Sequence, residues 1–162
     1  MTGYFPGYRA RPFPQLTDAQ LAEYVAANTA AIRDVISWAE PDYALANHLV
    51  MGPAILARTL PGRVPYAVRV HRSALEETVM PHVWRFGGYA RQGLARAHVV
   101  LVGSGHAAEE LWEVMRQPDL PDLPGCSPRA PNSQHTVFAH QEIGGMEAYS
   151  REQGPGKVVH AV

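Results

Sequence analysis

Residues 99–108 read VVLVGSGHAA, and this stretch decides the fold class. A run of four apolar residues without a charge is typical of a strand buried in a parallel sheet. A Gly-Ser-Gly turn follows, and a helical pattern then runs from His106 to Gln117 with Leu111 and Trp112 on its inner side. A buried strand that leads through a tight turn into a helix is the repeating unit of α/β proteins.

The same strand-to-helix pattern occurs twice earlier in the chain. Residues 43–46 and 64–70 are predicted strands, and a short apolar helix over 52–60 lies between them. A further helix is expected over 89–97, after a Gly87-Gly88 pair that argues against an earlier start. Alternating strands and helices predict an α/β fold, a Rossmann-like parallel sheet flanked by helices on both faces.

A long amphipathic helix precedes the first strand. Thr17 and Gln20 form a capping box at its start, and Pro41 ends it. Its apolar residues follow at helical spacing, and the polar Asn28 interrupts that face. The stripe consists of Leu21, Val25, Ile32, Ile36 and Ala39. Trp38 is also expected in the core, because it falls on a helical stripe.

Proline content divides the chain into three parts. Residues 1–15 are an extended lead-in, 16–117 carry the predicted Rossmann-like domain, and 118–162 are a proline-rich linker with an unassigned tail. Two apolar runs in the tail, 137–139 and 158–159, are too short to assign.

Composition argues against several classes of function. Fourteen basic and fifteen acidic residues give a net charge of -1, which disfavours a nucleic-acid partner because phosphate binding requires clustered cations. The single cysteine excludes an internal disulfide and a cysteine-based zinc site, and the eight histidines show no metal-binding spacing, so no metal is expected. No apolar run is long enough to cross a membrane and the N-terminus lacks a signal-peptide pattern, so a cytoplasmic location is expected.

Polar residues follow each predicted strand. Asn47-His48 come after the first strand, His71-Arg72-Ser73 after the second, and Gly103 to His106 after the third. The carboxyl ends of parallel strands meet at one edge of the sheet, and ligands bind there. We therefore expect these three segments along a common rim, with His71 directly at the ligand edge.

The turn after the third strand has two interpretations. Gly103 to Ala108 spell G-x-G-x-x-A between a strand and a helix, which is the local pattern of a dinucleotide-binding loop. That pattern also needs an acidic residue at the end of the next strand, and residues 118–122 do not read as a strand. The simpler interpretation, which we prefer, is a tight turn with Ser104 as the helix N-cap.

Three segments, taken in order, resemble the N-terminal, acceptor-side domain of retaining glycosyltransferases of the GT4 type, which have the GT-B architecture. The segments are PDYALANHLVMGPAILAR (41–58), VPYAVRVHRSALE (64–76) and YARQGLARAHVVLVGSGHAAEELW (89–112). Each piece alone is a weak signal, and their combination over about 70 residues carries the resemblance.

The resemblance implies roles for residues at the three strand ends. His71 matches the histidine that reaches toward the transferred sugar, and it is the predicted catalytic residue. His48 and Ser104 match substrate-binding positions on the acceptor side and in the cleft. Arg72 stands where the family has glycine, Gly105 stands where arginine is frequent, and both are expected near substrate. The family uses a nucleotide-sugar donor and needs no metal or other cofactor.

Parts of the family's structure have no counterpart in the resemblance. Missing are the first strand with its glycine-rich loop and the second Rossmann-like domain, which binds the nucleotide sugar. The chain is therefore expected to be a fragment, a partial transferase that is inactive alone. The sheet edge where the first strand would pair is expected to be exposed, which favours dimerisation.

Two other functions remain open at this point. One is a non-catalytic α/β binding or interaction module that pairs with a separately encoded donor domain or with a second copy of itself. The other is a nucleotide- or dinucleotide-binding domain that uses Gly103 to Ala108.

Overall fold

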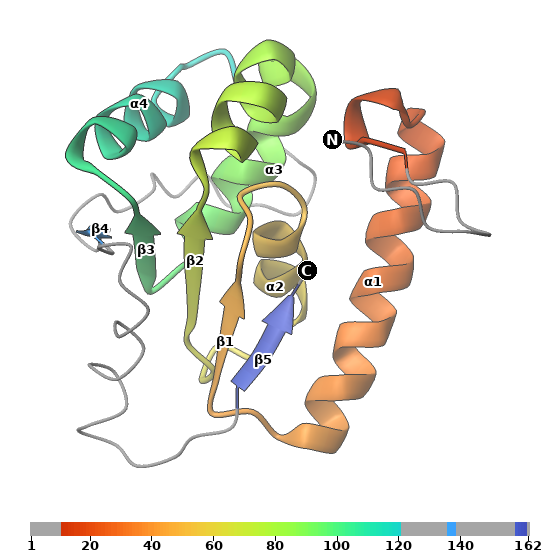
Figure 1. Ribbon diagram of the computed structural model, residues 1–162. Coiled ribbons are helices and arrows are strands. Elements are labelled where there is room, and N and C mark those ends of the chain that lie inside the picture. Colours follow the sequence, from red (N-terminus) through yellow and green to blue (C-terminus); the bar gives the residue numbers. More distant parts are fainter. Residues whose placement is uncertain (1–10, 121–135, 139–157, 162) are drawn as a thin grey trace.

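The computed structural model describes residues 11–120, 136–138 and 158–161, which form an α/β fold (Figure 1). Five parallel strands lie in the order β4-β3-β2-β1-β5. Their bounds are β1 Tyr43–Ala46, β2 Tyr66–Val70, β3 Val99–Val102, β4 Thr136–Phe138 and β5 Val158–Ala161. The main helices are α1 Asp18–Ala39, α2 Gly52–Thr59, α3 Val83–Ala95 and α4 Gly105–Met115. Three short helices complete the set: η1 Phe13–Gln15, η2 Ala74–Val79 and η3 Met80–His82.

The three strands predicted from the sequence form the centre of the sheet. β1 pairs with β2 and β2 pairs with β3, all in parallel. Side chains alternate between two faces along each strand, and those on one face are fully buried. The buried set comprises Ala44, Ala46, Tyr66, Val68, Val70, Val100 and Val102. The prediction of a parallel α/β sheet is confirmed at this level.

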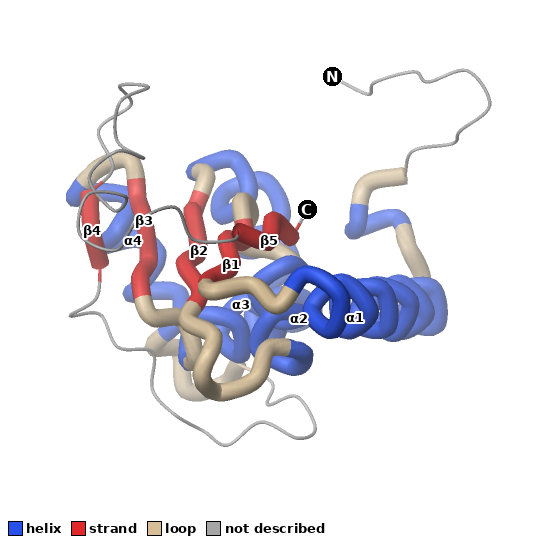
Figure 2. The backbone as a smooth tube through the Cα atoms, turned by 90° about the horizontal axis from the view of Figure 1, so that it is seen from below, coloured by secondary structure: helices blue, strands red, loops and turns tan. Residues whose placement is uncertain are grey.

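The prediction of helices on both faces is wrong for the described part of the chain. α1, α2 and α3 lie on the same side of the sheet (Figure 2). On the opposite face Leu45 and Leu101 are only half-buried, and Arg69 is exposed. The reason is topological: the steps from β1 to β2, β3 and β4 all go in one direction along the sheet. Right-handed crossovers that step in one direction keep every helix on one face.

Residues within 118–162, expected to be linker and tail, supply two strands. β4 pairs with β3 at one edge, and β5 pairs with β1 at the other. β5 therefore occupies the edge that was expected to be exposed. Strands of three and four residues carry too little pattern to be recognised locally, and their pairing partners lie far away in the sequence.

α1 begins as predicted, but it is less buried than its stripe suggests. The capping box is present: the Thr17 side chain accepts from the backbone of Gln20, and the Gln20 side chain accepts from the backbone of Thr17. Leu21 and Val25 are its only fully buried residues. Trp38 is 85% exposed, so its prediction as a core residue is wrong, whereas Trp112 on α4 is buried. The helix extends past the layer it packs on. None of the described helices is both long and apolar enough to cross a bilayer.

α3 starts earlier than predicted and runs through both glycines. A Cβ atom on Gly87 would come within 2.2 Å of the Leu120 side chain, and one on Gly93 within 2.7 Å of the Pro53 carbonyl carbon. These glycines therefore permit close packing, of the 116–120 turn on α3 and of α2 on α3. Their presence lowers helix propensity, but the tertiary contact overrides it.

We predict that Gly93→Ala destabilises the fold by about 1–3 kcal/mol, because the new methyl group collides with the backbone of α2 and not with a movable side chain. Gly62→Ala is the control, since a Cβ atom at Gly62 has nothing within 4 Å, and its change should stay within about 0.5 kcal/mol. Urea unfolding followed by circular dichroism measures both. Equal stability of the two variants would contradict the packing argument.

Candidate functional site

The carboxyl ends of the central strands bring two histidines together. The rings of His48 and His71 lie 5.0 Å apart between centroids, at an interplanar angle of 44°. The Nε2 atom of His71 lies 3.4 Å from Oδ1 of Asn47. The parallel pairing of β1 with β2 causes this arrangement, because it ends both strands at the same edge. The expectation that these residues share one rim is met.

His71 is held in an environment that favours its neutral form. Partial burial lowers the pKa of His71 below the ordinary value, and repulsion from His48 and Arg69 lowers it further. A hydrogen bond to Asn47 opposes this shift only in part. A neutral imidazole has one nitrogen that donates and one that accepts a hydrogen bond, so His71 can contact a hydroxyl group in either sense.

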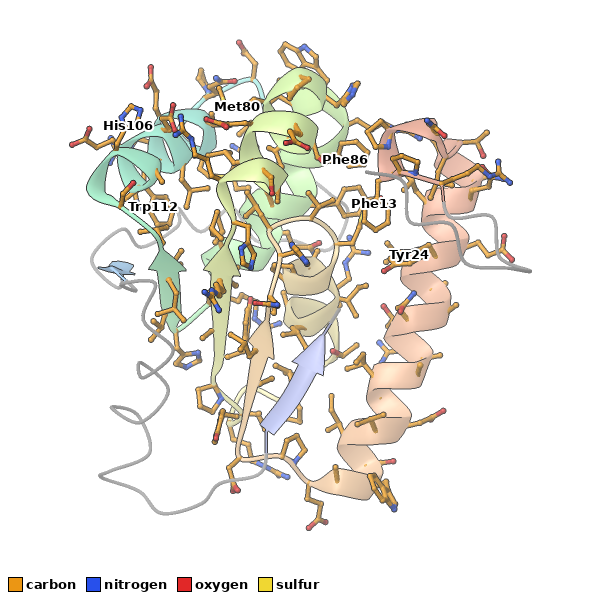
Figure 3. The ribbon with its side chains drawn as sticks, viewed as in Figure 1. Phe13, Tyr24, Met80, Phe86, His106 and Trp112 are labelled. Atoms are coloured by element: carbon orange, nitrogen blue, oxygen red, sulfur yellow. The ribbon has the colours of Figure 1, made fainter. Side chains whose placement is uncertain are left out.

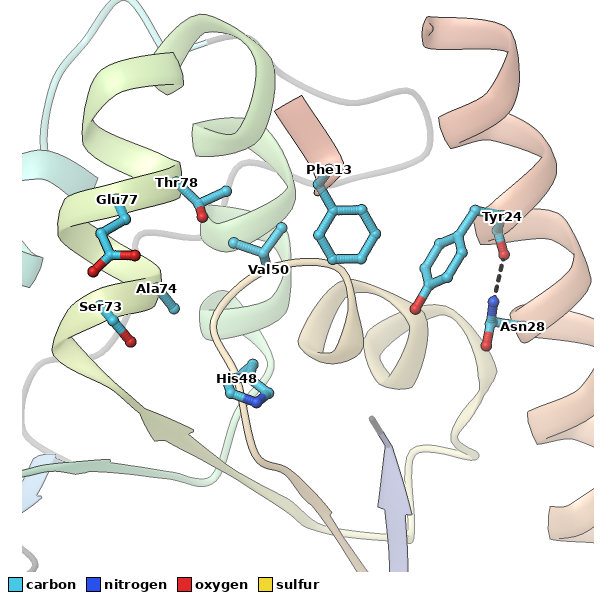
Figure 4. Close-up of a pocket in the computed structure, with 9 residues that line it drawn as sticks. All are labelled: Phe13, Tyr24, Asn28, His48, Val50, Ser73, Ala74, Glu77 and Thr78. Carbon is cyan, nitrogen blue, oxygen red and sulfur yellow. Dashed lines mark hydrogen bonds between the residues drawn. The ribbon is translucent and has the colours of Figure 1, made fainter. Parts of the chain in front are cut away.

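A pocket of about 450 Å³ opens beside this histidine pair (Figure 4). One wall comes from η1 and α1, and the other comes from η2 and the loop after β1. Its lining residues are Phe13, Tyr24, Asn28, His48, Val50, Ser73, Ala74, Glu77 and Thr78. Of the predicted site residues, only His48 lines it. The volume falls in the range of small-molecule sites.

The lead-in segment before α1 completes the pocket. Phe13 meets Tyr24 edge-to-face, with ring centroids 5.1 Å apart (Figure 3). Arg85 on α3 holds this segment in place: its guanidinium donates to the carbonyls of Pro14 and Leu16 and pairs with the Asp18 carboxylate. A residue about 70 positions away thus anchors the aromatic wall, which explains why sequence reasoning missed it.

One sequence signal did point toward this wall. Asn28 interrupts the apolar stripe of α1, and the structure places it in the pocket lining. Its Nδ2 donates to the carbonyl of Tyr24 at 2.8 Å. Ser73, in the predicted rim segment after β2, also lines the pocket. The remaining lining residues have no distinctive pattern in the sequence.

Ser104 and Gly105 lie at the start of α4. The Ser104 Oγ accepts from the backbone N–H of Ala107 at 3.2 Å, which confirms the N-cap interpretation. A Cβ atom at Gly103 would meet nothing within 4 Å, so no close backbone approach requires a glycine there. Both residues share the sheet edge with the histidines, but neither lines the pocket.

Arg72 is engaged in an ion pair on the surface. Its guanidinium binds the Glu76 carboxylate one helical turn away, and that contact, together with the charge of Glu110, raises the pKa of Arg72. His106 faces Glu110 at 3.5 Å in the same spacing. Arg72 thus stands outside the pocket on the rim between β2 and β3. Among the described residues, no three side chains of His, Cys, Asp or Glu gather closely enough to hold a metal ion.

Comparison with known proteins yields no relative: no family model, curated protein or solved structure matches this chain significantly. The likeness to GT4-type enzymes therefore remains a resemblance carried by the quoted segments.

We predict that His48→Gln raises the pKa of His71, because it removes one source of charge repulsion while it keeps a polar side chain. Two-dimensional NMR of the imidazole signals across pH measures it. His98→Gln is the control, since His98 precedes β3 at the opposite end of the strands. An unchanged or lowered pKa of His71 in His48→Gln would contradict the coupling.

Proposed function

We propose that this chain is the acceptor-side part of a retaining glycosyltransferase, which moves a sugar from a nucleotide-sugar donor to an acceptor hydroxyl. The observation that carries the proposal is the His48–His71 pair at the carboxyl edge of a parallel sheet, with a small-molecule pocket directly beside it. In sheets of this kind ligands bind at that edge. The residues also stand at the positions that the GT4 resemblance marks as sugar-facing and acceptor-facing.

Each residue has a distinct part in this proposal. His71, kept neutral, exchanges hydrogen bonds with hydroxyl groups of the transferred sugar. His48 lines the pocket and faces the acceptor. Ser104 accepts the helix N–H through its oxygen, and its own hydroxyl hydrogen can still donate into the cleft. Arg72 and Gly105 border the rim, where Glu76 competes with a diphosphate for the Arg72 guanidinium.

Transfer requires a donor-binding domain, and we propose that a separate chain supplies it. Departing diphosphate needs stabilisation by preorganised donors from both sides of a cleft. The described residues provide one side only. The purified chain should therefore release no nucleotide from a nucleotide sugar. A partner of this kind also separates the proposal from a non-catalytic interaction module, which would bind the partner without enabling transfer.

We predict that the purified chain incubated with UDP-glucose and 4-hydroxybenzyl alcohol forms no glucoside. In ¹⁵N and imidazole NMR spectra, methyl α-glucoside at millimolar concentration should shift the signals of His48 and His71. His71→Ala should abolish these shifts, because the sugar loses its hydrogen-bonding partner. His98→Ala, at the opposite edge, should leave them unchanged.

Two outcomes would count against this proposal. Glucoside formation by the chain alone would remove the need for a donor domain. Shifts confined to the start of α4 on addition of NAD⁺, with none from the glucoside, would favour nucleotide binding at Gly103 to Ala108 instead.

A further inference from the structure

The pocket has a polar pair on one wall that the strand-end chemistry does not use. Tyr24 and Asn28 lie one turn apart on α1 and face the cavity together (Figure 4). Residues four apart on a helix share a face, so both can contact one group of a ligand. His48 and Ser73 line the pocket from the sheet side.

This pair offers one donor and one acceptor. The hydrogen bond from Asn28 Nδ2 to the Tyr24 carbonyl fixes the amide and leaves Oδ1 as an acceptor. Burial raises the pKa of Tyr24, so its phenol keeps its proton at neutral pH and can donate. A donor beside an acceptor suits a hydroxyl group, which has both functions.

The rest of the lining is suited to an uncharged ring. Phe13, Val50 and Ala74 provide apolar surface between the two polar ends. Aromatic walls favour flat or cyclic ligands through stacking and edge contacts. Glu77 is the only acidic lining residue, and neither Arg nor Lys belongs to the lining in the described part of the chain. An anionic ligand would thus meet repulsion without a compensating cation.

We infer that this pocket holds a neutral cyclic acceptor with two hydroxyl groups at opposite ends of its ring. One hydroxyl lies between Tyr24 and Asn28, and the other lies near His48, where the sugar arrives. The inference rests on the proposed function and adds the chemical class of the acceptor: uncharged and ring-containing, not phosphorylated or carboxylated. α1 and the lead-in, not the strand ends, make this selection.

The test uses 4-hydroxybenzyl alcohol as the neutral probe and 4-hydroxybenzoate as its anionic counterpart. Titration of the full chain, followed by ¹⁵N NMR, should shift the backbone signals of Phe13, Tyr24, Asn28 and His48 with the alcohol. The benzoate should shift them far less at equal concentration. Comparable binding of the two probes would overturn the selection against anions.

Two variants test the polar pair. Tyr24→Phe and Asn28→Ala should each weaken the affinity for 4-hydroxybenzyl alcohol about 3- to 10-fold, the usual effect of one lost hydrogen bond. Tyr43→Phe and Ser37→Ala are matched controls outside the pocket lining and should bind like the unaltered chain. Unchanged affinity in both pocket variants, with native spectra, would overturn the role of the pair.

This outcome is separable from the proposed function. His71→Ala should abolish the shifts caused by methyl α-glucoside yet leave the affinity for 4-hydroxybenzyl alcohol unchanged, because His71 does not line the pocket. If the alcohol binds and the glucoside does not, sugar transfer fails and the pocket's ligand class stands. If the glucoside reaches His71 and the alcohol does not bind, only the present inference fails.

Discussion

Parallel alignment of β1, β2 and β3 is the constraint on which the rest of the structure depends. Each crossover helix returns the chain to the same end of the sheet, so the residue after every strand arrives at one edge. That geometry brings His48 within 5.0 Å of His71 although 23 residues separate them. An antiparallel pair would place the same histidines at opposite ends. The candidate chemistry is therefore a consequence of topology first and of side chains second.

The pocket depends on a second, weaker constraint, the docking of α1 and its lead-in. Only Leu21 and Val25 are fully buried along the 22 residues of α1. The contacts of Arg85 with the lead-in add hydrogen bonds to backbone carbonyls, which hold Phe13 opposite the sheet edge. Charged groups make the stronger hydrogen bonds, so a few of them can position a segment that buries little apolar area. The wall of the pocket is thus built by the part of the chain with the smallest core contribution.

The sheet is covered on one face and paired at the edge beside β1. All described crossovers step in one direction, which leaves Leu45, Arg69 and Leu101 on the face without helices. β5 takes the position where the GT4 resemblance expects a first strand. A strand at that position satisfies the backbone groups of β1, whichever part of the chain provides it. The likeness to that family lies in the three strand-to-helix units and their polar ends, not in the complete sheet.

The sequence by itself determined the three central strands, the start of α1, the N-cap at Ser104 and the rim that carries His48 and His71, because each depends on local pattern or on the parallel rule. Only the tertiary structure decided the exposed Trp38, the passage of α3 through Gly87, the two edge strands and the aromatic wall at Phe13. These features depend on contacts between residues far apart in the chain. Local periodicity shows which face of a helix is apolar, but it does not show where the partner surface ends or which distant side chain fills a gap.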